Sequence, residues 1–487
     1  MAPVSLSTQC VIGGRSVPAN SGKTFSTINP ATGKELAQIS RGAAADVDAA
    51  AAAARKAFDD GPWPRLSPME RKVHLQRFAT LIEANTEELA AMEALEAGKP
   101  ITDCLEIDIP ETVNTIRWHA EAADKIYDQL SPSGPGVVSM IVREPVGVVG
   151  CVLPWNFPAM MAAWKLGPIL ASGNTAVLKP AEQTSLSTIR IAELATEAGI
   201  PDGVINVVPG FGDTVGKAIG LHPGIDCVGF TGSTETGRLF LKYSADSNLK
   251  RVLLECGGKN PMVVMADAGD LDSVAEHALN SVFWNMGENC SSNSRLLVHE
   301  SLKAPLVDLM LERVGEWVVG DPMEAATRIG PLIEKAHLDK VLAAIELAKK
   351  EGANLLHGGK QVAKKTGGFF VEPTIFEGVT PKMALAREEV FGPVLAIQTF
   401  QTPEEAIRLA NDTEYGLAAS VFTQSNKTAL NAARAIRAGT VAVNCYGEGD
   451  VTTPFGGYGL SGFGGRDKGM AAHDQYCELK TIWVDLS

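Results

Sequence analysis

Short runs of β-branched residues alternate with helical hydrophobic patterns along the middle of the chain. The runs predict buried strands at residues 146–153, 175–178, 204–208, 227–230 and 252–254. Helices are predicted between them, for example at residues 187–198 and 212–221. Because strands that alternate with helices pair in parallel and are covered on both faces, the pattern predicts an α/β fold.

A second strand–helix series follows at residues 258–460. Its predicted helices cover residues 271–279, 302–315, 335–351 and 403–411, and its predicted strands cover residues 295–299 and 394–400. Before the first series, helical patterns occur at residues 42–58, 68–85, 87–97 and 109–126. Residues 136–143 and 476–486 have the pattern of exposed edge strands, which can pair with each other or with another subunit.

The composition limits the classes of function. The 487 residues are 45% hydrophobic and 21% charged, which is typical of a folded protein with several domains. The net charge of −14 makes nucleic acid and an anionic membrane unsuitable partners. Residues 145–164 carry no charge but include three prolines, so we expect a buried strand, a turn and a helix start there rather than a membrane span.

The cysteines and the N-terminus are typical of a cytoplasmic protein. Eight cysteines are scattered without a CxxC pair, which favours reduced thiols over a disulfide scaffold or a zinc site. Residues 1–14 lack the charge and the apolar core of a signal peptide. We therefore expect a cytoplasmic location and no metal site.

Polar or glycine-containing turns follow the strands of the first series. They occupy residues 154–156, 179–182, 209–212, 231–233 and 255–258. The carboxyl ends of parallel strands meet at one edge of a sheet, and ligands of such sheets bind there. The sequence therefore predicts that these turns line one crevice.

Two residues are candidates for covalent and general-base chemistry. Cys290 lies in the polar segment Gly287-Glu-Asn-Cys290, where a reactive thiol would be exposed, although an inert buried thiol is the usual alternative for a cysteine. No histidine lies near it in sequence, so nothing favours a Cys–His hydrolase. Glu255 ends an apolar strand, where burial would raise its pKa and suit it to act as a base; the alternative is a capping carboxylate.

Three features suit a dinucleotide. The turn at residues 210–216, which includes Gly212, follows a strand and opens a helix, although its spacing is not GxGxxG. Ser233 lies at a predicted helix start, either as a pyrophosphate contact or as an ordinary N-cap. Lys179 and Glu182 lie at one strand end, where a carboxylate could bind ribose hydroxyls and repel a 2′-phosphate, or where the two form a solvated pair.

Five motifs together resemble the aldehyde dehydrogenase superfamily over essentially the whole chain. They are Pro154-Trp-Asn-Phe-Pro158, Leu254-Glu-Cys-Gly-Gly-Lys259, Gly287-Glu-Asn-Cys290, Glu388-Glu-Val-Phe-Gly-Pro393 and Pro454-Phe-Gly-Gly-Tyr458. Within the superfamily, the chain is most similar to gamma-glutamyl-gamma-aminobutyraldehyde and other omega-aminoaldehyde dehydrogenases. The segments that indicate this are Ile116-Arg-Trp-His-Ala-Glu121, Asp124-Lys-Ile-Tyr127, Met140-Ile-Val-Arg-Glu-Pro-Val-Gly147 and Gly449-Asp450.

The resemblance implies a catalytic mechanism. Cys290 would attack the aldehyde carbonyl, and the Asn156 side chain with the Cys290 main-chain N–H would hold the oxyanion. Hydride would then pass to a nicotinamide, and Glu255 would activate the water that hydrolyses the thioester. The presence of Glu255 argues against the branch of the family that passes the acyl group to coenzyme A.

The resemblance also implies binding residues. For the cofactor, NAD with NADP as the alternative, they are Trp155, Lys179, Glu182, Ser233, Glu389 and Phe391, to which the turn above adds Gly212. For a small-molecule aldehyde they are the aromatic residues Phe157, Trp164 and Phe455. The acids Asp108, Glu111, Glu448 and Asp450 either form a rim that attracts an ammonium-bearing aldehyde or are ordinary solvated acids.

A three-part architecture follows from the same resemblance. Residues 1–126 and 146–257 are expected to form a Rossmann-like NAD-binding domain, and residues 258–465 a second α/β catalytic domain. Residues 127–145 and 470–487 are expected to form a small β arm that joins subunits of a homodimer or homotetramer.

The expected function is NAD(P)-dependent oxidation of an omega-amino or gamma-glutamylated amino aldehyde to a carboxylic acid. The alternatives are the same chemistry on betaine aldehyde, a semialdehyde or a simple aliphatic or aromatic aldehyde, and a non-catalytic binding protein with this fold. Two positions depart from the common family pattern: Glu288 replaces a glutamine, and Gly459 replaces a lysine in a C-terminal motif that also gains a glycine before Arg466. The second departure leaves the substrate open.

Overall fold

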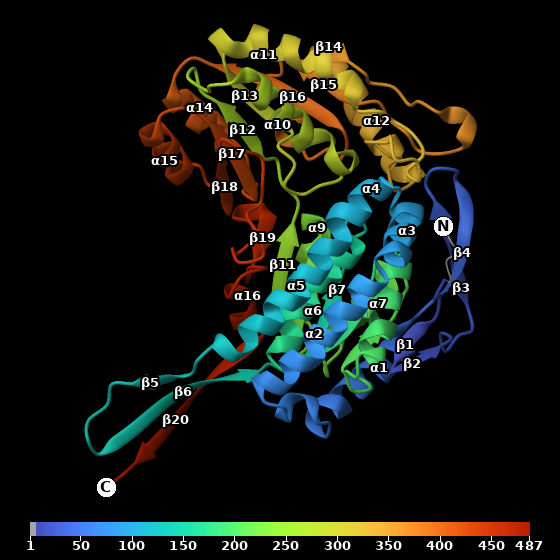
Figure 1. The fold of residues 1–487 in the computed structure, drawn as a ribbon, viewed down its shortest axis with the longest axis vertical. Coiled ribbons are helices and arrows are strands. Elements are labelled where there is room, and N and C mark those ends of the chain that lie inside the picture. Colours follow the sequence, from blue (N-terminus) through green and yellow to red (C-terminus); the bar gives the residue numbers. More distant parts are fainter. Residues whose placement is uncertain (1–5) are drawn as a thin grey trace.

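A mixed eight-stranded sheet carries the first strand series in the computed structural model, which describes residues 6–487 (Figure 1). Its strand order is β19-β11-β10-β7-β8-β9-β1-β2. The strands are β1 (Cys10–Ile12), β2 (Arg15–Val17), β7 (Val148–Val152), β8 (Thr175–Lys179), β9 (Ile205–Val207), β10 (Cys227–Gly232), β11 (Arg251–Cys256) and β19 (Gly462–Phe463). The five strands β7 to β11 are all parallel to one another, which confirms the predicted parallel sheet. Strands β1, β2 and β19 pair antiparallel at its edges.

Different helices cover the two faces of this sheet. One face carries α2 (Pro68–Ala84), α3 (Thr86–Ala97), α5 (Ile109–Ala122), α6 (Pro158–Ala171) and α7 (Leu186–Glu197), and the other carries α1 (Ala44–Asp59), α8 (Lys217–Leu221) and α9 (Thr234–Ala245). Val149 and Cys151 of β7 lie in the first core, and Val148 and Val152 lie in the second. This alternation is the period of a strand that is buried on both faces.

Local sequence explains where two of these helices begin. Ser67 Oγ accepts a hydrogen bond from the Glu70 N–H, the Glu70 carboxylate accepts one from the Ser67 N–H, and Pro68 takes the first helical position, so α2 begins where predicted. The predicted helix at residues 212–221 is shorter than expected. Gly212–Gly216 form a π-helical turn, and only the five residues of α8 are α-helical, because glycine at both ends of the turn disfavours the α-helix.

A seven-stranded sheet carries the second series. Its order is β14-β15-β16-β13-β12-β17-β18, and only the edge strand β14 is antiparallel to its neighbour. The strands are β12 (Pro261–Val264), β13 (Arg295–His299), β14 (Asn354–His357), β15 (Thr374–Glu377), β16 (Val394–Phe400), β17 (Ala418–Phe422) and β18 (Thr440–Val443). The helices around it are α10 (Leu271–Phe283), α11 (Glu300–Arg313), α12 (Lys335–Lys350), α13 (Ala384–Arg387), α14 (Pro403–Ala410) and α15 (Asn426–Ala435). This second α/β unit was also expected.

Three strands form an arm that extends away from both sheets (Figure 1). They are β5 (Gln129–Ser131), β6 (Val137–Pro145) and β20 (Cys477–Asp485). Strand β20 follows the short helix α16 (Ala471–Asp474) and pairs antiparallel with β6 along nine residue pairs. The two predicted edge strands could pair with each other or with another subunit. Within this chain they pair with each other.

One element near the N-terminus was not predicted. It is the hairpin of β3 (Thr24–Asn29) and β4 (Lys34–Ser40). Residues 145–164 contain the end of β6, strand β7 and the start of α6, as expected, and none of the helices in residues 6–487 is long and apolar enough to cross a membrane. The expectation about a signal peptide falls in part on residues 1–5, which lie outside the described residues.

Candidate active site

A cavity of about 390 Å³ lies where the carboxyl ends of β7, β10 and β11 face the loops of the second sheet. The turns after these three strands line it, as the strand-end argument predicts. The predicted site residues that line the cavity are Trp155, Asn156, Phe157, Trp164, Ser233, Glu255, Cys290, Glu389, Phe391 and Phe455. Thus the structure brings together all three predicted catalytic residues with the aromatic residues and part of the cofactor set.

The loop that carries Cys290 has a conformation that few sequences adopt. Asn285 and Met286 have φ values of 53° and 57°, and Gly287 has a φ of 71°. A Cβ on Gly287 would lie 2.3 Å from the carbonyl of Gly392, so only glycine fits there. The Asn260 side chain donates a hydrogen bond to the Cys290 carbonyl oxygen at 2.7 Å, which fixes the thiol at the cavity wall.

The surroundings of the Cys290 thiol favour its protonated form. Burial raises its pKa well above the ordinary value, and the negative charges of Glu448, Glu389 and Glu255 raise it further. A thiol is a weak nucleophile compared with its thiolate. Formation of the thiolate therefore requires that one of these charges be offset or that the proton be accepted by a neighbour.

Asn156 is positioned at the end of β7 by contacts to its main chain and side chain. Its carbonyl oxygen accepts hydrogen bonds from Lys99 Nζ at 3.0 Å and from Asn285 Nδ2 at 3.3 Å. Its own amide donates to the Glu288 carbonyl oxygen at 2.9 Å, on the loop that also carries Cys290. The Asn156 side chain is therefore tied by a hydrogen bond to the loop that carries Cys290.

Glu255, at the end of β11, is a buried carboxyl with a strongly raised pKa. Burial is the main cause, the charge of Asp467 adds to it, and Lys165 and Arg466 oppose it. Lys165 Nζ is 2.5 Å from Asp467 Oδ2 in a buried ion pair, so this pair sets the local field behind Glu255. The Glu255 Oε2 atom has no hydrogen-bond partner within residues 6–487, which leaves it free to accept a proton from water.

Two glycines let the carboxyl of Glu389 approach the same strand end. Its Oε1 accepts a hydrogen bond from the Gly258 N–H at 2.9 Å, and a Cβ on Gly257 would lie 2.0 Å from its Oε2. Burial raises the pKa of Glu389 to about 7. The Phe391 ring packs edge-on against Trp155 at 5.3 Å between ring centres, so the two aromatic rings form one wall.

The remaining predicted cofactor residues line no part of this cavity. Lys179 Nζ and Glu182 Oε2 form an ion pair at 2.8 Å at the end of β8, and Gly212 lies in the π-helical turn with open space beside it. Ser233 does line the cavity, but its Oγ also accepts from the Thr236 N–H and caps α9. Both roles left open for Ser233 are thus compatible with its position.

A second cavity of about 750 Å³ continues outward from the first. The two cavities share Met160, Trp164, Trp284 and Glu448 in their linings. The outer cavity adds the charged side chains of Asp103, Glu106, Glu111, Arg328 and Lys468. Of the predicted acidic rim, Glu111 and Glu448 lie in this passage.

Asp108 and Asp450 do not belong to the rim, which corrects the prediction. Asp108 is fully buried, and its Oδ2 lies 2.8 Å from Lys99 Nζ. Asp450 is exposed and outside both cavities, where it accepts hydrogen bonds from the N–H and hydroxyl of Thr452. Asp108 was expected either in the rim or as a solvated acid, but it ends the π-helical turn Cys104–Asp108 and faces the interior.

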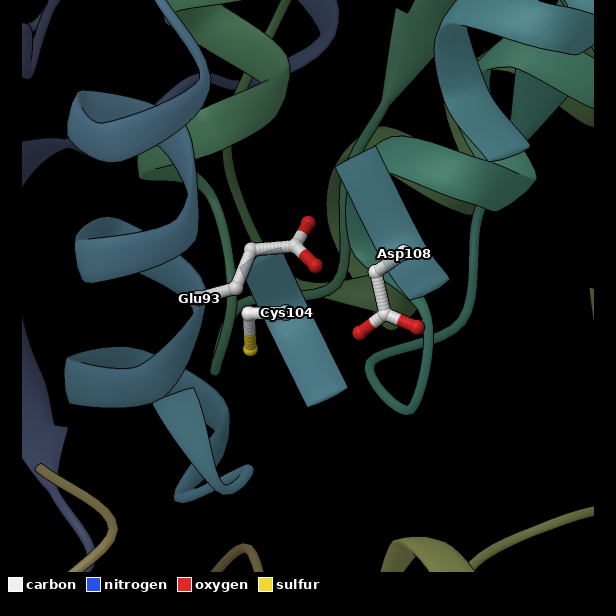
Figure 2. A group of neighbouring side chains, drawn as sticks. All are labelled: Glu93, Cys104 and Asp108. Atoms are coloured by element: carbon white, nitrogen blue, oxygen red, sulfur yellow. The ribbon is translucent and has the colours of Figure 1, made fainter. Parts of the chain in front are cut away.

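Figure 2 shows the surroundings of Asp108, where Glu93 and Cys104 point toward the same space. The three side chains have ligand atoms within 4.8 Å of one another, a spacing that metal sites also show. The Lys99 ammonium already supplies a positive charge to this cluster, and burial raises the pKa of Glu93 to about 7. The Lys99 ammonium thus compensates the charge of Asp108 within this cluster.

Sequence reasoning missed three residues that shape the site. Lys165 and Asp467 form the ion pair behind Glu255, and Lys99 holds the main chain of Asn156. A signal exists for Lys165, because it is a single charge next to the long uncharged segment 145–164. A lysine in an otherwise apolar run is usually paired when it is buried.

Comparison with known proteins defines the class of this fold and site. A family model described as "Aldehyde dehydrogenase family" matches residues 17–482. The chain belongs to the aldehyde dehydrogenase family, and it is an oxidoreductase of that family, as its motifs predict.

Among the curated relatives, an aminoacetaldehyde dehydrogenase of Pseudomonas aeruginosa is 55% identical over 100% of this chain and 97% of its own length. The NADP/NAD-dependent aldehyde dehydrogenase PuuC of Escherichia coli is 45% identical over 99% of this chain and 97% of its own. A solved structure of the P. syringae indole-3-acetaldehyde dehydrogenase AldA, a mutant in complex with NAD+ and IAA, superposes with a TM-score of 0.98 at 49% identity, covering 99% of this chain and 97% of that one. A gamma-glutamyl-gamma-aminobutyraldehyde dehydrogenase from Burkholderia cenocepacia superposes with a TM-score of 0.97 at 47% identity, with the same coverage. The predicted similarity to this part of the family is therefore confirmed.

Proposed function

We propose that this protein oxidises an aldehyde to a carboxylic acid through a covalent intermediate on Cys290. The sulfur attacks the carbonyl carbon and forms a thiohemiacetal, whose oxyanion accepts hydrogen bonds from the Asn156 amide and the Cys290 N–H. Loss of hydride from this intermediate gives a thioester. The observation that carries the proposal is the convergence of Cys290, Asn156 and Glu255 on one cavity.

Glu255 completes the cycle in this proposal. Its ionised carboxylate takes a proton from water as the water oxygen attacks the thioester carbon, the C–S bond breaks, and the acid leaves with the thiol regenerated. Its unpartnered Oε2 and its position on the same cavity support this role.

NAD is the proposed cofactor, and when bound it accepts the hydride. Three features of the chain fit a dinucleotide: the Lys179–Glu182 pair at the end of β8, the start of the twelve-residue helix α9 at Ser233, and the buried Glu389 carboxyl beside Gly258. Relatives that are named as complexes with NAD+ support the choice. Glu182 favours NAD over NADP because its charge would repel a 2′-phosphate.

An aldehyde that carries an amino group is the proposed substrate, as an omega-amino or gamma-glutamylated amino aldehyde. The outer cavity is lined by more acids than bases, so it attracts a cation. The names of the P. aeruginosa and B. cenocepacia relatives support the same class. Betaine aldehyde, semialdehydes and simple aliphatic or aromatic aldehydes remain the competing substrates.

The proposed assembly is a homodimer or homotetramer joined through the arm. Residues 1–126 and 146–257 would then act as the cofactor domain, residues 258–465 as the catalytic domain, and residues 127–145 and 470–487 as the arm. The arm exposes large apolar side chains on β20, with Leu479 and Trp483 at 67% and 65% exposure, as an interface strand does before it is covered.

Eight free cysteines are in keeping with a reducing, cytoplasmic location.

A panel of aldehydes assayed with NAD and with NADP tests the proposal. Wild-type protein should form NADH with aldehyde present, and Cys290→Ala should abolish this while it still binds NAD. Glu255→Gln should accumulate the acyl-enzyme, seen as added mass on the intact protein. Turnover by Cys290→Ala, or undiminished turnover by Glu255→Gln, would remove the respective residue from the mechanism.

A further inference from the structure

The loop after β18 places one carboxylate at the junction of the two cavities. Glu448 lines both the inner cavity that contains Cys290 and the outer cavity that leads to solvent. A substrate that enters from the outer cavity must pass this side chain before its carbonyl meets Cys290. Met160, Trp164 and Trp284 are the other residues common to both linings, so apolar and aromatic surface surrounds the carboxylate.

Hydrogen bonds hold Glu448 next to the nucleophile. Ser291, the residue after Cys290, donates its hydroxyl to Glu448 Oε1. The neighbouring Tyr446 hydroxyl accepts from Asn289 Nδ2 at 2.7 Å, so the loop is tied to both sides of Cys290. Lys468 Nζ lies 3.4 Å from the Glu448 carbonyl oxygen and therefore supports the main chain rather than the carboxylate.

The charge of Glu448 is not paired by the protein. Among the ion pairs of residues 6–487, none includes its carboxylate. Of the charged neighbours that raise the pKa of Cys290, Glu448 acts most strongly. An unpaired carboxylate in this passage attracts a cation through its charge, whereas the Trp164 ring already has the Lys468 ammonium at 4.9 Å from its centre.

We propose that Glu448 binds the ammonium group of a short amino aldehyde, and that it is the residue that favours such aldehydes over neutral aldehydes of the same size. The inference rests on the proposed aldehyde oxidation and assigns its charge selectivity to one side chain. The ammonium bound there offsets the charge that opposes the Cys290 thiolate. A neutral aldehyde leaves that charge in place, so Glu448 assists one substrate and hinders the other.

The test replaces Glu448 with glutamine and compares matched substrates. Glu448→Gln removes the charge but keeps an oxygen that accepts from Ser291, so the loop stays tied. The substrate pairs are aminoacetaldehyde with propanal and 3-aminopropanal with butanal, in which a methyl group replaces the ammonium. Asp450→Asn is the matched control, because it removes one charge from the same loop outside both cavities and keeps the oxygen that accepts from Thr452.

Glu448→Gln should lower kcat/KM for the amino aldehydes by about ten-fold or more, the usual effect of one charge-assisted hydrogen bond, and should leave the neutral aldehydes unchanged or faster. Asp450→Asn should leave the ratio between paired substrates as in wild type. An equal loss on both members of a pair, or an unchanged ratio, would show that Glu448 is structural and overturn the inference. If wild type oxidises both members equally well, the inference fails while aldehyde oxidation stands; if wild type oxidises neither, the proposed function itself fails.

Discussion

Replacement of Lys99 by methionine tests how the segment of Asn156, the proposed oxyanion donor, is held. Lys99 is buried and makes three contacts: an ion pair with Asp108 at 2.8 Å, a hydrogen bond to the Asn156 carbonyl oxygen at 3.0 Å, and an ammonium–ring contact with Phe157 at 3.7 Å from the ring centre. It therefore links the π-helical turn of residues 104–108 to the segment that presents Asn156 to the cavity. Methionine fills a similar volume but makes none of the polar contacts.

The size of the effect follows from these contacts. Removal of one partner from a buried ion pair costs about 3–5 kcal/mol, because the other charge remains buried. The lost hydrogen bond to the Asn156 carbonyl oxygen accounts for about 1 kcal/mol, either within this range or in addition to it. We expect kcat/KM to fall about ten-fold or more, below the 10²–10³ or so that complete loss of one oxyanion donor costs in comparable enzymes.

The destabilisation should depend on pH with a definite sign. Burial already raises the pKa of Asp108, while Lys99 opposes this shift, so removal of Lys99 raises the folded-state pKa further. The unfolded chain releases this proton at an ordinary carboxyl pKa, and the folded variant keeps it. The free energy of unfolding of Lys99→Met should therefore be closest to the wild-type value at low pH. It should fall further below that value as the pH rises toward the raised pKa of Asp108.

Urea unfolding midpoints and steady-state kinetics, measured at pH 6 and pH 8, check these expectations. The double variant Lys99→Met/Asp108→Asn should recover part of the lost stability, because the charge of Asp108 is no longer buried without its partner, but should not recover kcat/KM, because the bond to Asn156 stays absent. Full recovery of activity by the double variant would show that Lys99 only neutralises Asp108. An unchanged midpoint in the single variant would refute the buried pair.

Three further predictions concern other parts of the molecule. Because burial raises the pKa of Glu255 and the base acts only when ionised, the rate of thioester hydrolysis in single turnovers should rise with pH through a value well above the ordinary carboxyl range; a flat profile would contradict the role of Glu255. Glu182→Gln should raise the NADP to NAD ratio of kcat/KM by roughly ten-fold, since it removes the charge that we propose to face the 2′-position; an unchanged ratio would place Glu182 away from the ribose. Leu479→Lys with Trp483→Lys should reduce the mass measured by light scattering if β20 is an interface, whereas an unchanged mass would move the interface elsewhere.

The α/β fold could be predicted because its central strands are buried on both faces. Strands such as β7 and β8 consist of uninterrupted apolar or β-branched runs, and glycine or polar turns mark their ends. Strand β12 was missed because its four residues follow a polar turn directly and give too short a signal. The β3–β4 hairpin was missed because its faces are largely solvated, so it lacks the alternation of a half-buried strand.

The candidate catalytic residues could be placed from the sequence because each lies near a strand end or in a loop with unusual glycines. Glu255 ends β11, Asn156 follows β7, and the conformation around Cys290 requires Gly287. Lys99 was not recognised, because its partners Asp108 and Asn156 come from other segments and only the packing of α3 against the turn at 104–108 brings them together. Pairing of a buried charge is decided by tertiary contacts, which hydrophobic periodicity does not describe.

Asp108 and Glu448 show why the acidic rim in particular could not be placed by sequence alone. Both are acids close to a recognisable motif, and both contribute equally to a net charge of −14. Asp108 faces a lysine that compensates its charge inside the protein, whereas no ion pair within residues 6–487 involves Glu448. A compensated carboxylate exerts little net attraction on an incoming cation, while an uncompensated one in a low-dielectric passage exerts a strong one. The charge selectivity that we propose for this site therefore depends on which acid remains unpaired rather than on how many acids lie nearby.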